Sequence, residues 1–282
     1  MPELPEVECV RRGLESLRGR SVTAVQRGAF DVVHAAGGLG SSGLLVGDRL
    51  HRVHRHGKQL ALEGQRGGVV AIHLGMTGTL DVVPAARPLE AHTHVRWRLG
   101  DDHDLRFRDP RRFGGVWVLG NVHELHTRRW SRLGPDALRA GPAALHARTR
   151  GRRTALKAFL LDQSVLAGLG NIYVDELLYA ARVAPWRPVH TLTRRDWAGL
   201  VRRMRTLLGR AIAAGGSTLR DYRHTDGQSG RFQERFRVYG RAGQRCRRRG
   251  CRHPIERLIL AGRSTHVCGG CQGPPPLTGV RE

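Results

Sequence analysis

Residues 1–19 read MPELPEVECVRRGLESLRG, and they contain the first regular apolar pattern of the chain. Apolar side chains recur at intervals of three, four and three residues, on one face of a helix: Val7, Val10, Leu14 and Leu17. We expect this helix to end near Gly19, because glycine commonly follows the last helical turn. The segments that follow are expected to fold around its apolar face.

The same stretch carries a candidate nucleophile. If Met1 is removed, Pro2 has a free secondary amine, whose pKa of about 8 leaves an uncharged fraction at neutral pH. Glu3 lies next to it and could move protons. The structural alternative is that the prolines and glutamates of this stretch only favour the start of a helix, where acidic side chains meet the positive end of the helix dipole.

Roughly the next hundred residues have the pattern of strands. Residues 94–99 (HVRWRL) and 58–63 (KQLALE) alternate apolar and polar side chains, whereas 69–74 (VVAIHL) form a buried run. Clusters of Gly, Asp and Pro separate these segments. The pattern predicts an antiparallel β-sandwich built around the N-terminal helix.

The second half of the chain has the pattern of helices. Helical segments are expected at 154–163 and 172–183, with the glycine-containing turn GLGN (168–171) between them. A third helical stripe runs over 197–211, and Thr193 with Asp196 resembles a capping box before it. A loop bearing Gly, Gln and Ser follows, and then a short cysteine-bearing tail.

The charge balance points to a polyanionic partner. Lys and Arg number 48 against 24 Asp and Glu, which gives a formal net charge of +24, although an arginine-rich genome would account for part of this excess. Nucleic acid is the first expectation for such a chain. Because the sequence holds no membrane-spanning apolar run and no signal-peptide core after Met1, we expect a cytoplasmic, nucleoid-associated protein. Nothing signals oligomerisation, so a monomer is expected.

Four of the five cysteines form two close pairs near the C-terminus. Four residues separate the first pair and two separate the second: Cys246 with Cys251, and Cys268 with Cys271. Four thiolates in two pairs predict one tetrahedral, structural Zn²⁺ site, with no open position for catalysis. The residues between the pairs suit a β-hairpin with 255–260 as one strand. His253 is an alternative ligand to Cys251, and the tail alone would also suit a non-catalytic DNA-binding zinc module.

Seven motifs along the chain, taken in order, point to one family. They are PELPEVE (2–8), RHGK (55–58), HLGMTG (73–78), DPRRFG (109–114), GLGNIYVDE (168–176), YGRAGQ (239–244) and GRSTHVCGGCQ (262–272). Together they resemble the formamidopyrimidine-DNA glycosylase family, bacterial repair enzymes that act on oxidised purines. The resemblance covers about residues 1–272.

The resemblance implies an α+β multidomain fold with double-stranded DNA as partner. Its parts are an N-terminal β-sandwich with an N-terminal helix, a helix–two-turn–helix domain and a C-terminal β-hairpin zinc finger. DNA is expected across the cleft between the two domains. The implied boundaries are a catalytic β-sandwich domain at 1–125, a linker at 126–150, the helical domain at 151–222, a lesion-covering loop at 223–235, the zinc finger at 236–272 and a disordered tail at 273–282.

The resemblance also implies a bifunctional glycosylase/lyase of base excision repair. Such an enzyme must flip the damaged nucleotide out of the duplex before it can reach the sugar. The implied nucleophile is Pro2, which forms a Schiff base and leads to β,δ-elimination. Glu3 matches the acid/base residue, Lys58 a general acid, and Arg263 the arginine of the second elimination.

Further positions match DNA-contacting residues of the family. Met76, Arg111 and Phe113 are expected to fill the gap left by the flipped nucleotide, with two apolar wedges and a guanidinium for the unpaired base. Backbone or phosphate contacts are expected from His92, Arg152, Lys157 and Asn171. Lesion contacts are expected from Ser217, Thr218 and Tyr222. Glu176 is expected instead to be a buried hydrogen-bonding partner.

Two features bear on the alternatives. The family usually has two residues inside the first cysteine pair, so the four present here predict a bulged knuckle that still holds zinc. An endonuclease VIII-like enzyme for oxidised pyrimidines is the nearest alternative, and Leu4 together with the Met–Arg–Phe set argues against it. A DNA-binding zinc protein without catalysis is the other, and the intact Pro2, Glu3 and Lys58 argue against that.

Overall fold

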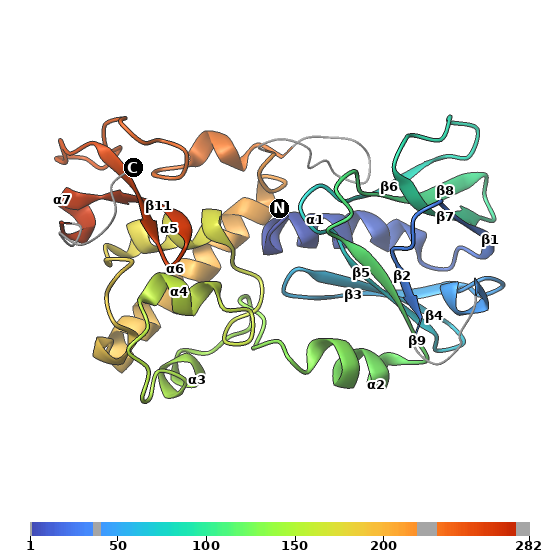
Figure 1. Ribbon diagram of the computed structural model, residues 1–282, viewed down its shortest axis with the longest axis horizontal. Helices are drawn as coiled ribbons and strands as arrows, with labels where there is room; N and C mark the ends of the chain where they lie inside the picture. Colours follow the sequence, from blue (N-terminus) through green and yellow to red (C-terminus); the bar gives the residue numbers. More distant parts are fainter. Residues whose placement is uncertain (1, 36–40, 219–229, 275–282) are drawn as a thin grey trace. The chain divides into compact units, whose positions relative to one another are not determined.

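A computed structural model describes residues 2–35, 41–218 and 230–274 (Figure 1). The expected lesion contact Tyr222, most of the lesion-covering loop and the tail from 275 onward lie outside these residues. The chain forms two compact units. Unit 1 comprises Met1–Arg132 and Ile212–Gln233, and unit 2 comprises Leu133–Ala211 and Glu234–Glu282.

Unit 1 begins with the predicted N-terminal helix. Helix α1 spans Leu4–Leu14 and is followed by a 3-10 turn, η1 (Glu15–Leu17). The four apolar residues of the 3-4-3 pattern are all at most 1% exposed, so this prediction is confirmed. Pro5 lies in the first turn, where its missing N–H costs nothing.

Two sheets enclose this helix, as the sandwich prediction requires. One has the strand order β2 (Val33–Ala35), β9 (Gly115–Leu119), β5 (Val69–His73), β4 (Gln59–Gly64), β3 (Leu50–His56). The other has the order β1 (Val22–Arg27), β7 (Thr93–Leu99), β8 (His103–Arg108), β6 (Thr79–Pro84). Side chains of both sheets and of α1 share one apolar core, in which Trp97 and Phe107 are the bulkiest.

One strand pair corrects the expectation of a wholly antiparallel sandwich. β2 pairs with β9 in parallel, from Val33 opposite Val116 to Ala35 opposite Val118. Most of the sandwich lies between these two strands in sequence, and a connection of that length lets a strand return in either direction. The other pairs of unit 1 are antiparallel. The unit also holds η2 (Ser41–Leu44), α2 (Val122–Glu124) and the π-helical η3 (Leu125–Trp130).

Unit 2 is helical and ends in a hairpin. Its helices are α3 (Pro142–Ala147), α4 (Leu156–Leu161), α5 (Asn171–Ala181), η4 (Val189–Thr191) and most of α6 (Arg194–Ala213). The Thr193–Asp196 capping box is confirmed, because each residue's backbone N–H donates to the other's side chain at 3.0 and 3.2 Å. The short η5 (Phe232–Arg235) lies where the chain passes from unit 1 into unit 2.

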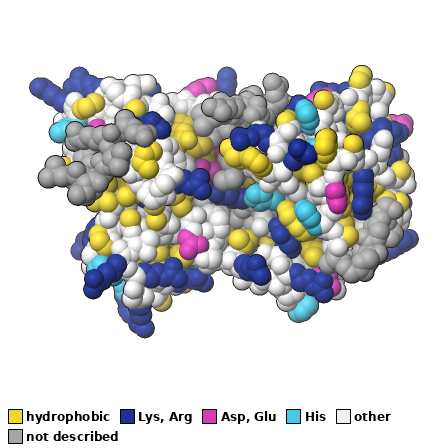
Figure 2. All heavy atoms as spheres, viewed as in Figure 1, with side chains coloured by type: hydrophobic (Ala, Val, Ile, Leu, Met, Phe, Trp, Pro, Cys, Tyr) yellow, Lys and Arg dark blue, Asp and Glu magenta, His cyan; other side chains and the backbone are white. Residues whose placement is uncertain are grey.

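The C-terminal hairpin pairs β10 (Ile255–Leu260) with β11 (Arg263–Cys268), followed by α7 (Gly269–Gln272). The predicted strand at 255–260 is confirmed. Ala261 and Gly262 both have positive φ, as a tight two-residue hairpin turn requires. None of the helices in the described ranges is long and apolar enough to cross a membrane. Figure 2 shows that Lys and Arg side chains outnumber Asp and Glu on the visible face.

Candidate active site and metal centre

The N-terminal residues are fixed by a buried carboxylate. Pro2 and Glu3 are buried, and Glu3 caps α1. The Glu3 backbone N–H donates to Glu6 Oε2 at 2.9 Å, and Glu6 Oε1 accepts from the N–H and hydroxyl of Ser217 at 2.7 and 2.9 Å. Glu6 therefore ties the candidate nucleophile to the segment that precedes residues 219–229. Its three-residue spacing from Glu3 is a capping-box signal that could have identified it.

Ser217 is buried, and its N–H and hydroxyl both donate to Glu6. Its two donors are therefore engaged, so the predicted lesion contact at Ser217 stays a prediction for its carbonyl and hydroxyl oxygens as acceptors. Thr218 links the two described segments that precede and follow residues 219–229. Its hydroxyl accepts the N–H of Gly230 at 2.9 Å, and its own N–H donates to Gln233 Oε1 at 3.0 Å.

A second carboxylate of α1 fixes the turn that carries Lys58. Glu8 Oε2 accepts from Arg55 Nε at 2.9 Å, and Arg55 Nη1 donates to the carbonyl of Gly57 at 2.9 Å. Gly57 has φ of +55° in the tight β3–β4 turn, a conformation suited to glycine. Burial raises the pKa of Glu8, but the hydrogen bonds from Arg11 and Arg55 outweigh it and lower that pKa to about 2. The anchor of the Lys58 turn is therefore charged at neutral pH.

His73 lies beside this turn and was not among the predicted site residues. It pairs across the sheet with Gln59, the residue after Lys58. Burial, followed by the charges of Lys58 and Arg129, lowers the pKa of His73 to about 4. Its Nδ1 accepts the Gly75 N–H at 3.2 Å, so the neutral ring carries its proton on Nε2. A neutral N–H donor thus stands next to a lysine, and its place at the head of HLGMTG was the available signal.

Two exposed apolar side chains stand on adjoining loops. Met76 is 42% exposed and Phe113 is 55% exposed, so neither belongs to the core. The loop backbones touch, since a Cβ at Gly75 would lie 2.5 Å from the Phe113 carbonyl carbon. The Arg111 guanidinium lies 4.6 Å from the centroid of the Phe113 ring. The structure therefore brings the predicted gap-filling trio together on one surface of unit 1.

A fully buried aspartate holds these loops. Asp109 Oδ1 accepts from the Thr77 hydroxyl at 2.6 Å, and Oδ2 accepts from the Gly114 N–H at 2.7 Å. The Asp109 N–H donates to the carbonyl of His92, an exposed residue with φ of +65°. His92 is thus held next to the same loops. The role of Asp109 could not be predicted from the sequence, because it depends on a loop more than thirty residues away.

In unit 2, Lys157 corrects a prediction. Its side chain is 0% exposed, and its ammonium donates to Asp175 Oδ1 at 2.7 Å, the Ser264 carbonyl at 2.8 Å and the Thr265 hydroxyl at 2.9 Å. A lysine enclosed in this way does not reach a DNA phosphate, so the predicted DNA contact is wrong. Asp175 Oδ2 also accepts the His266 N–H at 2.9 Å, and together these bonds fix β11.

Of the other predicted residues of unit 2, two make hydrogen bonds within the protein and two are exposed. Asn171 donates its amide to the Ser264 carbonyl at 2.9 Å, and Glu176 accepts the backbone N–H groups of residues 237–239 at 2.9–3.0 Å. Burial raises the pKa of Glu176, which those bonds partly oppose, and its predicted role as a buried partner is confirmed. Arg152 and Arg263 are exposed, and Arg263 begins the strand that the Lys157 network holds.

The four paired cysteines of unit 2 form a cluster that could hold a metal ion. Their sulfurs lie within 4.8 Å of one another, with Cys246 to Cys271 at 3.9 Å and Cys251 to Cys268 at 3.5 Å. A tetrahedral site with metal–sulfur distances near 2.3 Å has sulfurs about 3.8 Å apart, so the set fits one ion. His253 is not part of this group, which resolves the alternative ligand in favour of Cys251.

Comparison with known proteins identifies the family. The protein-family model of the formamidopyrimidine-DNA glycosylase N-terminal domain matches residues 1–116. The family model of the formamidopyrimidine-DNA glycosylase H2TH domain matches residues 133–223. The formamidopyrimidine-DNA glycosylase of Thioalkalivibrio sulfidiphilus is 42% identical over 280 residues, covering 96% of this chain and 100% of the relative. That of Laribacter hongkongensis is 44% identical over 285 residues, with the same coverage.

Solved structures agree with this result. The crystal structure of the MutM (Fpg) protein from Thermus thermophilus has a TM-score of 0.85 at 38% identity, covering 98% of this chain and 100% of that one. A Lactococcus lactis Fpg mutant in complex with DNA containing Fapy-dG has a TM-score of 0.86 at 31% identity, covering 96% and 99%. The chain therefore belongs to the formamidopyrimidine-DNA glycosylase family, the bifunctional glycosylases and AP lyases that remove oxidised purines in base excision repair.

Proposed function

We propose that this chain excises 8-oxoguanine and formamidopyrimidines from double-stranded DNA, with the secondary amine of Pro2 as nucleophile. The observation that carries the proposal is the fixed N-terminus. Glu6 holds the backbone of Glu3 and the N–H and hydroxyl of Ser217 at one carboxylate, which positions the first residues through their main chain. The relative solved with Fapy-dG DNA supports the substrate class.

The lesion must leave the base stack before it can react, at a cost of a few kcal/mol. We assign the compensation to the exposed trio on the adjoining loops: Met76, Arg111 and Phe113. Two apolar side chains can occupy the gap, and the guanidinium can donate to the base left without a partner. Asp109 keeps the two loops together while the DNA is distorted.

The chemistry then proceeds at the sugar. The Pro2 nitrogen attacks C1′ as the bond to the base breaks, and the departing base takes the electron pair and the proton that the Pro2 nitrogen loses. Glu3 gives a proton to O4′, the C1′–O4′ bond opens, and an iminium ion remains on Pro2. This cation acidifies the C2′ proton, whose loss expels the 3′ phosphate, and a second elimination expels the 5′ phosphate. Lys58 and Arg263 are proposed as the charged groups that meet these phosphates.

We further propose that the four-cysteine centre holds one structural Zn²⁺ ion. Four thiolates are the ligand set of closed structural zinc sites, and they leave no position for a reacting water. The ion would tie the knuckle at Cys246–Cys251 to the end of β11, and so stabilise the hairpin that carries Arg263. We also propose that the enzyme works in the bacterial cytoplasm with the nucleoid, where its DNA substrate would lie.

Covalent trapping tests the nucleophile. Duplex DNA with one 8-oxoguanine is incubated with the zinc-loaded protein and borohydride, which reduces the iminium to a stable adduct. We expect Pro2→Gly and Glu3→Gln to lose at least 100-fold in cleavage while duplex affinity changes little. The matched control is Glu15→Gln, which alters the next carboxylate-bearing turn of the same segment and should cleave normally.

Two outcomes would overturn the assignment. Cleavage at the normal rate by both variants would remove Pro2 and Glu3 from the mechanism, as would full activity in protein that mass spectrometry shows to retain Met1. Faster excision of thymine glycol than of 8-oxoguanine would move the enzyme to the endonuclease VIII-like branch. Metal analysis should give one zinc per chain.

A further inference from the structure

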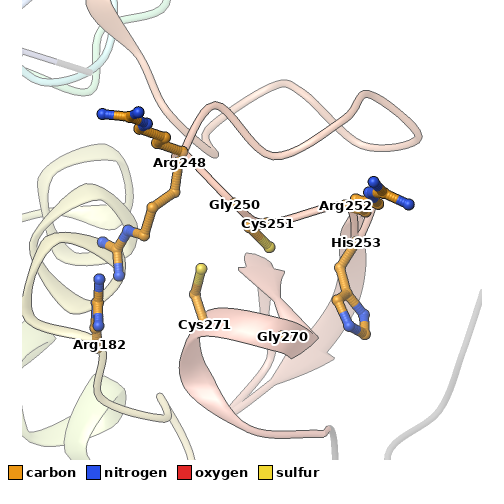
Figure 3. A pocket seen from close by; sticks show the side chains of 9 residues that line it. Arg182, Arg248, Gly250, Cys251, Arg252, His253, Gly270 and Cys271 are labelled. Carbon is orange, nitrogen blue, oxygen red and sulfur yellow. The ribbon is translucent and has the colours of Figure 1, made fainter.

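A pocket of about 510 Å³ lies beside the cysteine centre of unit 2 (Figure 3). That volume is within the range of small-molecule sites. The pocket lies between the C-terminal end of α5, the long first knuckle and α7. Its lining comprises Arg182, Arg248, Arg249, Gly250, Cys251, Arg252, His253, Gly270 and Cys271.

The lining is strongly cationic. It holds four guanidinium groups and no carboxylate. Four thiolates around one zinc dication would carry a net charge of −2, so even that whole charge leaves a formal surplus of two positive charges around the pocket. Guanidinium groups are always protonated and present planar donor pairs that match the oxygens of a phosphate.

Two of these arginines converge. Arg182 caps α5 with φ of +58°, and its backbone N–H donates to the Tyr179 carbonyl at 3.1 Å. Arg248 Nη2 donates to the same carbonyl at 2.8 Å, and its guanidinium lies 4.6 Å from the centroid of the Tyr179 ring. Figure 3 shows the two side chains pointing toward one another. Like charges that point toward one another repel, and an anion between or beside them would offset that repulsion.

One donor at this point is left unsatisfied. Arg248 Nη1 is buried and has no hydrogen-bond partner in the described residues. A buried charged donor without an acceptor carries a desolvation cost, and an anion in the pocket would offset the charge of this guanidinium. The convergence, the charge surplus and the unsatisfied donor all point to the same class of ligand.

We infer that this pocket binds a phosphate group, supplied either by a DNA backbone or by a small phosphorylated molecule. Gly250 and the exposed Arg249 belong to the four residues between Cys246 and Cys251. The inference rests on unit 2 alone and does not depend on the role proposed for Pro2. Zinc would hold the knuckle in place, and the arginines would bind the ligand.

Inorganic pyrophosphate is the probe for the pocket, measured by calorimetry at fixed ionic strength with the zinc-loaded full chain. The test variant is Arg182→Asn with Arg249→Ser, since asparagine tolerates the left-handed conformation at position 182. The control is Arg245→Ser with Arg257→Ser, two exposed arginines of the same region outside the pocket lining. We expect a tenfold or greater loss of pyrophosphate affinity in the test pair and less than twofold in the control pair.

The salt dependence of duplex binding separates the two sources. A backbone phosphate in the pocket would make the slope of log K against log salt about 0.9 shallower per lost contact in the test pair than in the control pair, and pyrophosphate would compete with DNA. A small phosphorylated ligand would leave the slopes equal, with pyrophosphate binding unchanged by DNA. Either result supports the pocket.

The inference is overturned if pyrophosphate does not bind and the slopes of the two pairs are equal. Zinc content is checked in each variant, and Arg252→Ser replaces the test pair if zinc is lost, because Arg252 is an exposed member of the lining. Borohydride trapping with these variants keeps the outcomes distinct. Trapping at the normal level with lost pyrophosphate binding would separate the pocket from the Pro2 chemistry.

Discussion

Each unit uses a carboxylate on a helix to hold another segment, and the two carboxylates differ in their exposure to water. In unit 1, Glu8 of α1 holds Arg55, which in turn holds the turn of Lys58. In unit 2, Asp175 of α5 holds Lys157, and both bind the strand that begins with Arg263. Each helix-borne carboxylate thus fixes a segment with a residue of the proposed chemistry.

The difference lies in access to water and in the choice of cation. The side chain of Glu8 is 10% exposed and three arginines share it, so loss of one bond leaves others. Lys157 and Asp175 are both 0% exposed, and a single ammonium serves three acceptors there. A partly hydrated network tolerates a deletion better than a dry one, because water can replace the missing partner.

The largest effect should follow from breaking the dry network. We expect Lys157→Met to destabilise unit 2 by about 3–5 kcal/mol, because it leaves the Asp175 carboxylate buried without its cation. Denaturant unfolding of the zinc-loaded protein measures the change. Duplex affinity should show no loss of salt dependence, because Lys157 does not reach the surface.

Two companion variants sharpen this result. Lys157→Met with Asp175→Asn should recover part of the loss, because the remaining amide oxygen still accepts the His266 N–H and no charge is buried. Arg152→Ala, an exposed change just before α4, should cost less than about 0.5 kcal/mol. A stable Lys157→Met protein with a reduced salt slope would instead restore the DNA-contact role.

The next largest loss of stability should come from the Glu8 network, and it should depend on pH. The folded-state pKa of Glu8 is lowered from 4.5 to about 2, so its contribution is fully present above pH 4.5 and is lost as the pH falls toward 2. That shift corresponds to about 3 kcal/mol. Glu8→Gln should therefore lose about this much at neutral pH and show a flatter stability curve between pH 4.5 and 2.

Glu15→Gln is the comparison variant. Its carboxylate is 37% exposed and pairs with Arg11 from the same helix, so we expect a loss below about 1 kcal/mol. Cleavage should fall in Glu8→Gln and not in Glu15→Gln, since only Glu8 supports the Lys58 turn. Equal pH profiles for the two variants would contradict the assignment of the pKa shift to Glu8.

Local patterns in the sequence predicted secondary structure, whereas contacts between distant segments could not be predicted from it. The 3-4-3 spacing of α1 and the alternation in β4 and β7 are local patterns, and the structure confirms the elements they predict. Lys157 was predicted to contact phosphate because it matches a basic position of the family near the DNA backbone. Its partners at Ser264 and Thr265 lie more than one hundred residues away, so only the fold reveals its burial.

The hydrogen-bond partners of Asp109 and Ser217 could not be predicted from the sequence for the same reason. A carboxylate before a proline predicts a turn, but its bonds to Thr77 and Gly114 depend on two loops that meet in space. The Ser217 hydroxyl donates to Glu6, which lies more than two hundred residues away in the sequence. The exposure of Met76 and Phe113 was equally hidden, because an apolar residue in a glycine-containing loop is as consistent with the core as with a surface.

The smallest effect on stability, and the sharpest contrast with both networks, should come from Phe113→Ala. The ring is 55% exposed, so its removal should change the free energy of unfolding by less than about 0.5 kcal/mol. Single-turnover excision of 8-oxoguanine should nevertheless fall at least tenfold, because the gap in the stack loses its wedge while flipping still costs a few kcal/mol. Leu89→Ala is the matched control, since Leu89 is 52% exposed in the same unit and lies outside the two loops. Equal excision rates for the two variants would mean that Phe113 is an ordinary surface residue, and the trio would then have to be reduced to Met76 and Arg111.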